Sequence, residues 1–208
     1  MLNTIAVALK RLAFRVFRKA KQPEKRTQNA SSGNSSIPFQ LIDNPETALG
    51  GQELYAIGRI TVQMAALELD LIRFLSALMF KNPDAGIAVF LGINLKSLIE
   101  MLLPAFRLKV KSEAFDDDIV SLVSALDKLA AERNAIVHGQ WHYDPLQQRP
   151  MRAKTRKGKP KDKEQLHYFQ TEKTSAYALH QFADLLVLAR KVVVRFYQKL
   201  LRESLIAG

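Results

Sequence analysis

Three side chains with complementary chemistry lie close together in residues 133–138. Arg133 carries a fixed positive charge, Asn134 carries an amide, and His138 carries an imidazole. An imidazole can take a proton from a hydroxyl or give one to it, and a guanidinium can stabilise negative charge that develops on a phosphate. This set of residues therefore suits proton transfer beside an anionic group, as in cleavage of a phosphodiester.

The spacing of these residues places only two of them on one face of a helix. Asn134 and His138 are four residues apart and share a face, whereas Arg133 and His138 are separated by about 140° on an ideal helix. We expect Gly139 to end the helix at His138, because glycine is common just after a helix C-terminus. The imidazole could then turn toward Arg133.

A purely structural interpretation of the same residues stays open. His138 could cap the helix C-terminus, and Arg133 falls in register with an apolar stripe, where a charge needs a partner. Glu68 interrupts the apolar stripe of an earlier helix in the same way. Since a buried charge is costly alone, we predict that Glu68 meets Arg133 or the polar groups beside it.

The run Arg-Asn-x-x-x-His at the end of a third helix resembles the active-site motif of HEPN-domain proteins. This all-helical family includes many metal-independent endoribonucleases of toxin and defence systems. The resemblance implies that His138 is the general acid or base, that Arg133 stabilises charge on the phosphate, and that Asn134 positions the phosphate or His138. It also implies a homodimer and requires no metal and no cofactor.

The remaining pattern predicts an all-α domain of four helical segments with a small β-hairpin insert, and the resemblance implies that these helices form a HEPN-like four-helix bundle. Apolar residues recur at helical spacing over residues 52–80, 84–103 and 174–203, and the third helix follows Ser112 as its N-cap. Asn82 and Pro83 end the first of these helices, and Pro104 should break or kink the second. We therefore expect the folded domain to span residues 50–208.

A basic segment follows the motif directly. Polar and apolar residues alternate over about residues 140–172, which predicts a hairpin or three-stranded flap. Its cations could contact phosphates and its tryptophan could stack on a base. The flap is accordingly a candidate RNA-binding wall made of Trp141, Arg149, Arg152, Lys154, Arg156 and Lys157. The alternative is an ordinary solvated loop.

The net charge of +11 is concentrated in two segments. Residues 1–26 and residues 149–163 each hold eight Lys or Arg and one acidic residue, about +7 apiece, so the remaining chain is about −3. Residues 1–21 predict a separate basic amphipathic helix, with Leu2, Ile5, Leu9, Leu12, Ala13 and Val16 on one face. It could bind a membrane surface or nucleic acid, or pack on the body or on a partner. We expect residues 22–49 to form a flexible linker.

Three functions remain open. The first is a metal-independent endoribonuclease, either a toxin or a defence component, with RNA as substrate and an antitoxin or another protein as partner. The second is a non-catalytic HEPN-like module that binds RNA, nucleotide or protein. The third is a membrane-surface interaction protein acting through residues 2–20. We expect a cytoplasmic protein, attached to a membrane only in the third case. Cysteine is absent, which excludes disulfides and a cysteine nucleophile.

Overall fold

A computed structural model describes residues 49–144, 149–157 and 167–206 of the chain. The helices are α3 (Gly51–Met79), α4 (Pro83–Phe90), α5 (Leu95–Lys109), the 3-10 turn η1 (Glu113–Phe115), α6 (Asp116–Val137) and α7 (Ala176–Arg202). Three strands, β1 (Gln140–Asp144), β2 (Arg149–Lys157) and β3 (His167–Lys173), lie between α6 and α7. The expected helix at 1–21 and linker at 22–49 lie outside the described residues, apart from Leu49.

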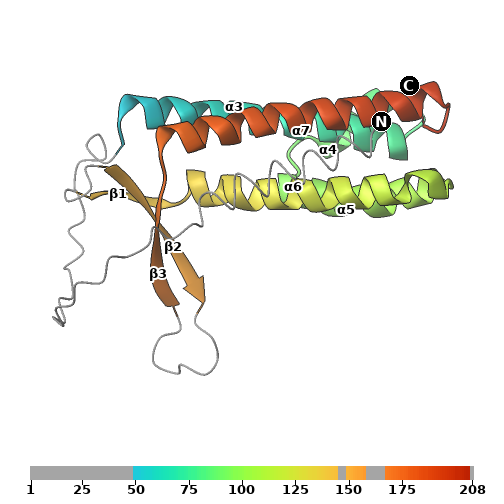
Figure 1. Cartoon of the computed structure of the whole chain (residues 1–208). Coiled ribbons are helices and arrows are strands. Elements are labelled where there is room, and N and C mark those ends of the chain that lie inside the picture. Colours follow the sequence, from blue (N-terminus) through green and yellow to red (C-terminus); the bar gives the residue numbers. More distant parts are fainter. Residues whose placement is uncertain (1–48, 145–148, 158–166, 207–208) are drawn as a thin grey trace.

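The long helices form two layers, with the sheet at one end (Figure 1). α3 and α7 lie side by side and run in the same direction, since Arg59 pairs with Asp184 and, further along, Asp70 pairs with Arg190. α6 runs the opposite way and ends where α3 and α7 begin (Figure 1). The C-terminal end of α6 therefore lies beside the sheet.

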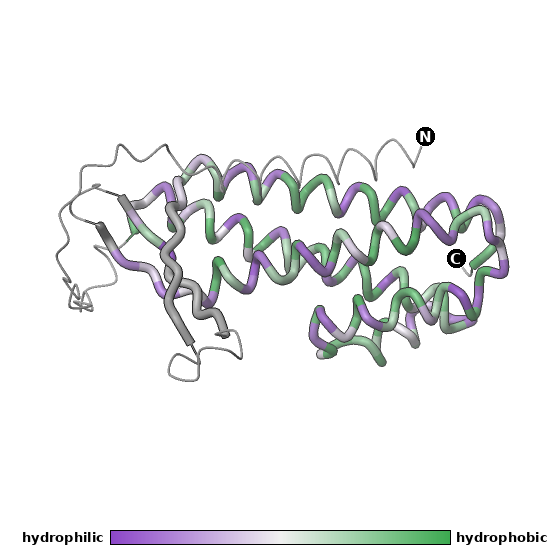
Figure 2. Tube along the Cα trace, turned by 60° about the horizontal axis from the view of Figure 1, so that its bottom comes forward, coloured by the Kyte–Doolittle hydropathy of each residue, from purple (hydrophilic) through white to green (hydrophobic). Residues whose placement is uncertain are grey.

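A helical core holds these layers together. Hydrophobic and hydrophilic residues alternate turn by turn along the helices (Figure 2), as expected for amphipathic helices that bury one face. Large side chains that are fully buried come from four helices: Phe74, Leu98, Phe106, Leu126 and Leu179. The predicted helical bundle with a small β insert is confirmed. No helix in the described ranges combines the length and the apolar character needed to cross a membrane.

The prediction of one helix over residues 84–103 is wrong. The helix stops at Phe90 and restarts at Leu95, because Gly92 adopts a left-handed φ of 89° and the Asn94 side chain accepts a hydrogen bond from the Ser97 N–H at 3.0 Å. Pro104 does not end α5, which continues to Lys109. Pro104 is exposed, and the burial of Leu102 and Phe106 on either side favours continuing the helix past it.

The other helix boundaries agree with the sequence to within a few residues. Asn82 caps α4 by accepting from the Asp84 N–H, with Pro83 in the first turn, and Ser175 caps α7 by accepting from the Ala178 N–H. Ser112 precedes the 3-10 turn rather than α6 and makes no side-chain capping hydrogen bond. α6 itself begins at Asp116.

The insert is a three-stranded antiparallel sheet in the order β1-β2-β3. In the register, Trp141 faces Arg152 across β1 and β2, and Arg152 faces Glu172 across β2 and β3. Only one residue, Gly139, separates the C-cap of α6 from β1. The sheet is thereby held directly against the end of the helix that carries the candidate motif.

Candidate active site

The structure brings Arg133, Asn134 and His138 together at the C-terminal end of α6. The Arg133 Nη1 donates to the Asn134 Oδ1 at 3.0 Å and lies 3.5 Å from the His138 Nε2. Asn134 and His138 are exposed, whereas Arg133 is half-buried. One chain is therefore sufficient to assemble the three predicted residues.

The end of the helix accounts for this convergence. α6 stops at Val137, and His138 follows as the C-cap with φ −103° and ψ 3°, its N–H still donating to the Asn134 carbonyl at 2.9 Å. This backbone lies outside the regular helix, so the 140° separation of an ideal helix no longer applies. The expected helix end near His138 is confirmed to within one residue.

The geometry also constrains the imidazole. A guanidinium has donors and no acceptor, so in a hydrogen bond between the Arg133 Nη1 and the His138 Nε2, which lie 3.5 Å apart, the imidazole nitrogen is the acceptor. Such a nitrogen can take a proton from a hydroxyl. The Arg133 Nε is buried and has no hydrogen-bond partner among the described residues, so this guanidinium keeps donor capacity that Asn134 does not satisfy.

A hydrogen bond and a close approach at Gly139 join the end of α6 to the sheet. The Trp141 indole N–H donates to the Ile136 carbonyl at 3.0 Å, satisfying one of the carbonyls that a helix leaves without a partner in its last turn. A Cβ on Gly139 would lie 2.4 Å from the Ala135 carbonyl oxygen. Gly139 is therefore required by close approach, and its φ is outside the left-handed region.

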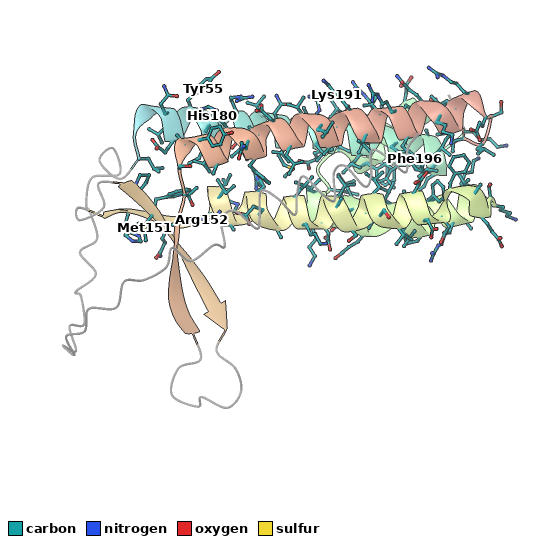
Figure 3. All side chains as sticks on the ribbon, viewed as in Figure 1. Tyr55, Met151, Arg152, His180, Lys191 and Phe196 are labelled. Carbon is teal, nitrogen blue, oxygen red and sulfur yellow. The ribbon has the colours of Figure 1, made fainter. Side chains whose placement is uncertain are left out.

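A buried ion pair adds a third contact between sheet and helix. The Arg152 Nη2 on β2 donates to the Glu132 Oε1 on α6 at 2.8 Å. Arg152 is 3% exposed, and Figure 3 shows it beside the C-terminal end of α6. Glu132 immediately precedes Arg133, so the sheet anchors the backbone from which the candidate catalytic guanidinium extends.

Two members of the predicted RNA-binding set have structural roles instead. Arg152 cannot contact RNA from the surface, because its guanidinium is buried against Glu132. Trp141 is half-buried, packs on the core and uses its indole N–H on α6, so it is not a free stacking face. Arg149, Lys154, Arg156 and Lys157 lie on β2, but their side chains are outside the described part of the structure.

The predicted contact between Glu68 and Arg133 is wrong. Glu68 forms no hydrogen bond or ion pair with any described residue, and Arg133 contacts Asn134 and His138 instead. Arg133 is four residues, about 6 Å, from the end of α6 that lies beside the start of α3, whereas Glu68 is 17 residues, about 25 Å, beyond that start. The two charges share an apolar register but differ in axial position.

A polar cluster between α3 and α7 was not predicted from the sequence. Arg59 donates to the His180 Nδ1 at 3.0 Å and to the Asp184 Oδ1 at 2.7 Å, and the Tyr55 ring lies 5.8 Å from the His180 ring. Tyr55 and Arg59, like His180 and Asp184, are spaced i, i+4, which was the available signal. Figure 3 places Tyr55 and His180 on the α3–α7 layer, away from Arg152.

Comparisons with known proteins found no matching family model, no matching curated protein and no matching solved structure.

Proposed function

We propose that the protein is a metal-independent, HEPN-like endoribonuclease whose reaction is carried by Arg133, Asn134 and His138. The observation that supports this proposal is the 3.5 Å approach of the Arg133 Nη1 to the His138 Nε2, with Asn134 bound to the same nitrogen of the guanidinium. A cation and a proton acceptor on one exposed helix end are the two groups that transesterification of RNA needs.

In the proposed reaction, the His138 Nε2 takes the proton of a ribose 2′-hydroxyl, whose oxygen attacks the adjacent phosphorus. Arg133 stabilises the additional negative charge on the phosphoryl oxygens, and Asn134 holds the guanidinium in place. The bond from phosphorus to the 5′-oxygen then breaks, and that oxygen receives a proton from the imidazolium. The products are a 2′,3′-cyclic phosphate and a 5′-hydroxyl.

The test is cleavage of cellular RNA in EDTA by the parent protein beside His138→Ala, with chemical identification of the fragment ends. His180→Ala is the matched control, since Arg59 keeps its Asp184 partner when the imidazole is removed. We expect cyclic phosphate ends from the parent and from the control only. Equal cleavage by His138→Ala would remove His138 from the mechanism, and RNA binding without cleavage by either protein would favour a binding module.

A further inference from the structure

One face of α3 is exposed although it carries no charged residue over four turns. It consists of the residues that we call the α3 stripe: Leu54, Gly58, Thr61, Val62, Ala65 and Leu69. Leu54 is 51% exposed and Val62 64% exposed. Their spacing keeps them on one side of the helix, opposite the buried Ile60, Met64 and Leu67. A surface helix is expected to place polar residues at such positions.

The same face of α3 is covered further along the helix. Ser76 lies five turns beyond Gly58, on the same side, and is fully buried under α4, where a Cβ on Gly86 would be 2.7 Å from the Ser76 Cβ. Ile72 on this face is buried as well. The second half of this face of α3 thus packs closely against another helix. The first half is equally free of charged residues, but no described residue packs on it.

Gly58 indicates which kind of element could pack on the exposed half of this face. A glycine inside a helix is unfavourable relative to alanine, and a Cβ on Gly58 would meet nothing within 4 Å. No contact among the described residues therefore explains a glycine there. Together with Ala65 it leaves a shallow track, which would let another helix backbone approach closely.

The chain contains a segment of matching length and pattern. Leu2, Leu9 and Val16 mark the apolar face of residues 2–20, and they span about 21 Å as a helix, against about 22 Å from Leu54 to Leu69. The intervening residues 21–48, treated as a flexible chain, have a root-mean-square reach of about 30 Å. This tether can bring residues 2–20 to the stripe at an effective concentration of about millimolar.

Charge favours the same pairing. Residues 1–26 carry about +7, while the chain outside this segment and the flap is about −3. Glu68 borders the stripe, is half-buried and has no partner among the described residues. A half-buried carboxylate is stabilised by a nearby cation, which the basic residues flanking the apolar face of residues 2–20 would supply.

We propose that the apolar face of residues 2–20 docks on the α3 stripe of the same chain and that one of its basic residues pairs with Glu68. The docking would cover the exposed apolar side chains and explain Gly58. It is independent of the proposed ribonuclease activity, because Arg133, Asn134 and His138 contribute nothing to the stripe.

The absence of cysteine allows a direct test in the full chain. Spin labels at Lys10→Cys, in the N-terminal segment, and at Lys191→Cys, exposed on α7 (Figure 3), report the intramolecular distance by double electron–electron resonance. We expect a narrow distance distribution. Ala65→Glu should broaden it severalfold, Glu68→Gln should add a broad component, and Ala131→Glu, at an exposed alanine of α6, should leave it unchanged.

Four outcomes would overturn the proposal. A broad distribution in the parent, or a narrow one that Ala65→Glu leaves intact, would show that the stripe does not hold the segment. A narrow distance that appears between singly labelled chains after mixing would assign the stripe to a second copy. A narrow distance that forms only with anionic lipid vesicles would assign residues 2–20 to a membrane. Circular dichroism of each variant verifies that the helices are retained.

Discussion

Replacing Gly139 by alanine tests how the motif is held in place. A Cβ at this position would lie 2.4 Å from the Ala135 carbonyl oxygen and 3.0 and 3.1 Å from the Arg152 Cγ and Cδ. Ordinary van der Waals contacts of a Cβ begin near 3.4 Å. The carbonyl belongs to the last turn of α6 and Arg152 is held by Glu132, so neither neighbour can move without disturbing the junction between helix and sheet.

The expected cost follows from this geometry. Adding a methyl group to a well-packed site usually costs about 1–3 kcal/mol, and the backbone oxygen places Gly139→Ala in the upper part of that range, about 2–3 kcal/mol. Urea unfolding would measure this loss as a lower midpoint with an unchanged slope. Since His138 precedes Gly139, we also expect RNA cleavage to fall, if the proposed function holds.

Gly51→Ala is the matched control for Gly139→Ala. It makes the same chemical change at the start of α3, where a Cβ would meet nothing within 4 Å. We expect its free energy of unfolding to stay within about 0.5 kcal/mol of the parent or to rise slightly. If Gly139→Ala were equally harmless, the tight junction between α6 and β1 would be refuted.

Three further predictions concern other parts of the fold. The Arg107 side chain donates a hydrogen bond to Asp116 at 2.8 Å and lowers the pKa of that carboxyl. Asp116→Asn should therefore reduce the urea midpoint of unfolding at pH 7. The difference between variant and parent should vanish as the pH falls through the lowered pKa, below the ordinary value of about 4. Trp141→Phe removes the indole hydrogen bond to the last turn of α6 and should cost about 1 kcal/mol in urea unfolding. Leu98→Ala, at a fully buried core position, should cost about 3 kcal/mol by the same measurement, whereas Leu108→Ala, 77% exposed, should change little.

The helices themselves follow from local sequence. The apolar period of about 3.6 residues predicts α3 and α7 nearly to their ends, because each buries one continuous face. The boundary at Asn82 and Pro83 is equally local, since a capping side chain and a proline act on their own turn. The break at Gly92 was missed because Ile87, Leu91 and Leu95 continue the helical spacing across it, so the apolar pattern concealed the left-handed glycine.

The residues of the candidate motif were also predictable from the sequence, but their surroundings were not. Arg133, Asn134 and His138 are near neighbours in the chain, so the end of one helix is enough to bring them together. The role of Arg152 depends on the sheet folding back against α6, which turns an expected surface cation into a buried partner of Glu132.

The sequence by itself determined which faces of α6 and α7 are buried, where the flap begins and which side chains could do chemistry. It did not determine the buried face of α3, where the apolar Leu54 and Ala65 continue the helical spacing but are exposed. Only the tertiary structure decided which charges meet. Periodicity gives the angle of a residue around its helix axis but not the distance along that axis at which another helix crosses it. For this reason Glu68 could not be matched to Arg133 from register, and Asp70, two residues later, is the acid of α3 that Arg190 binds at 2.9 Å.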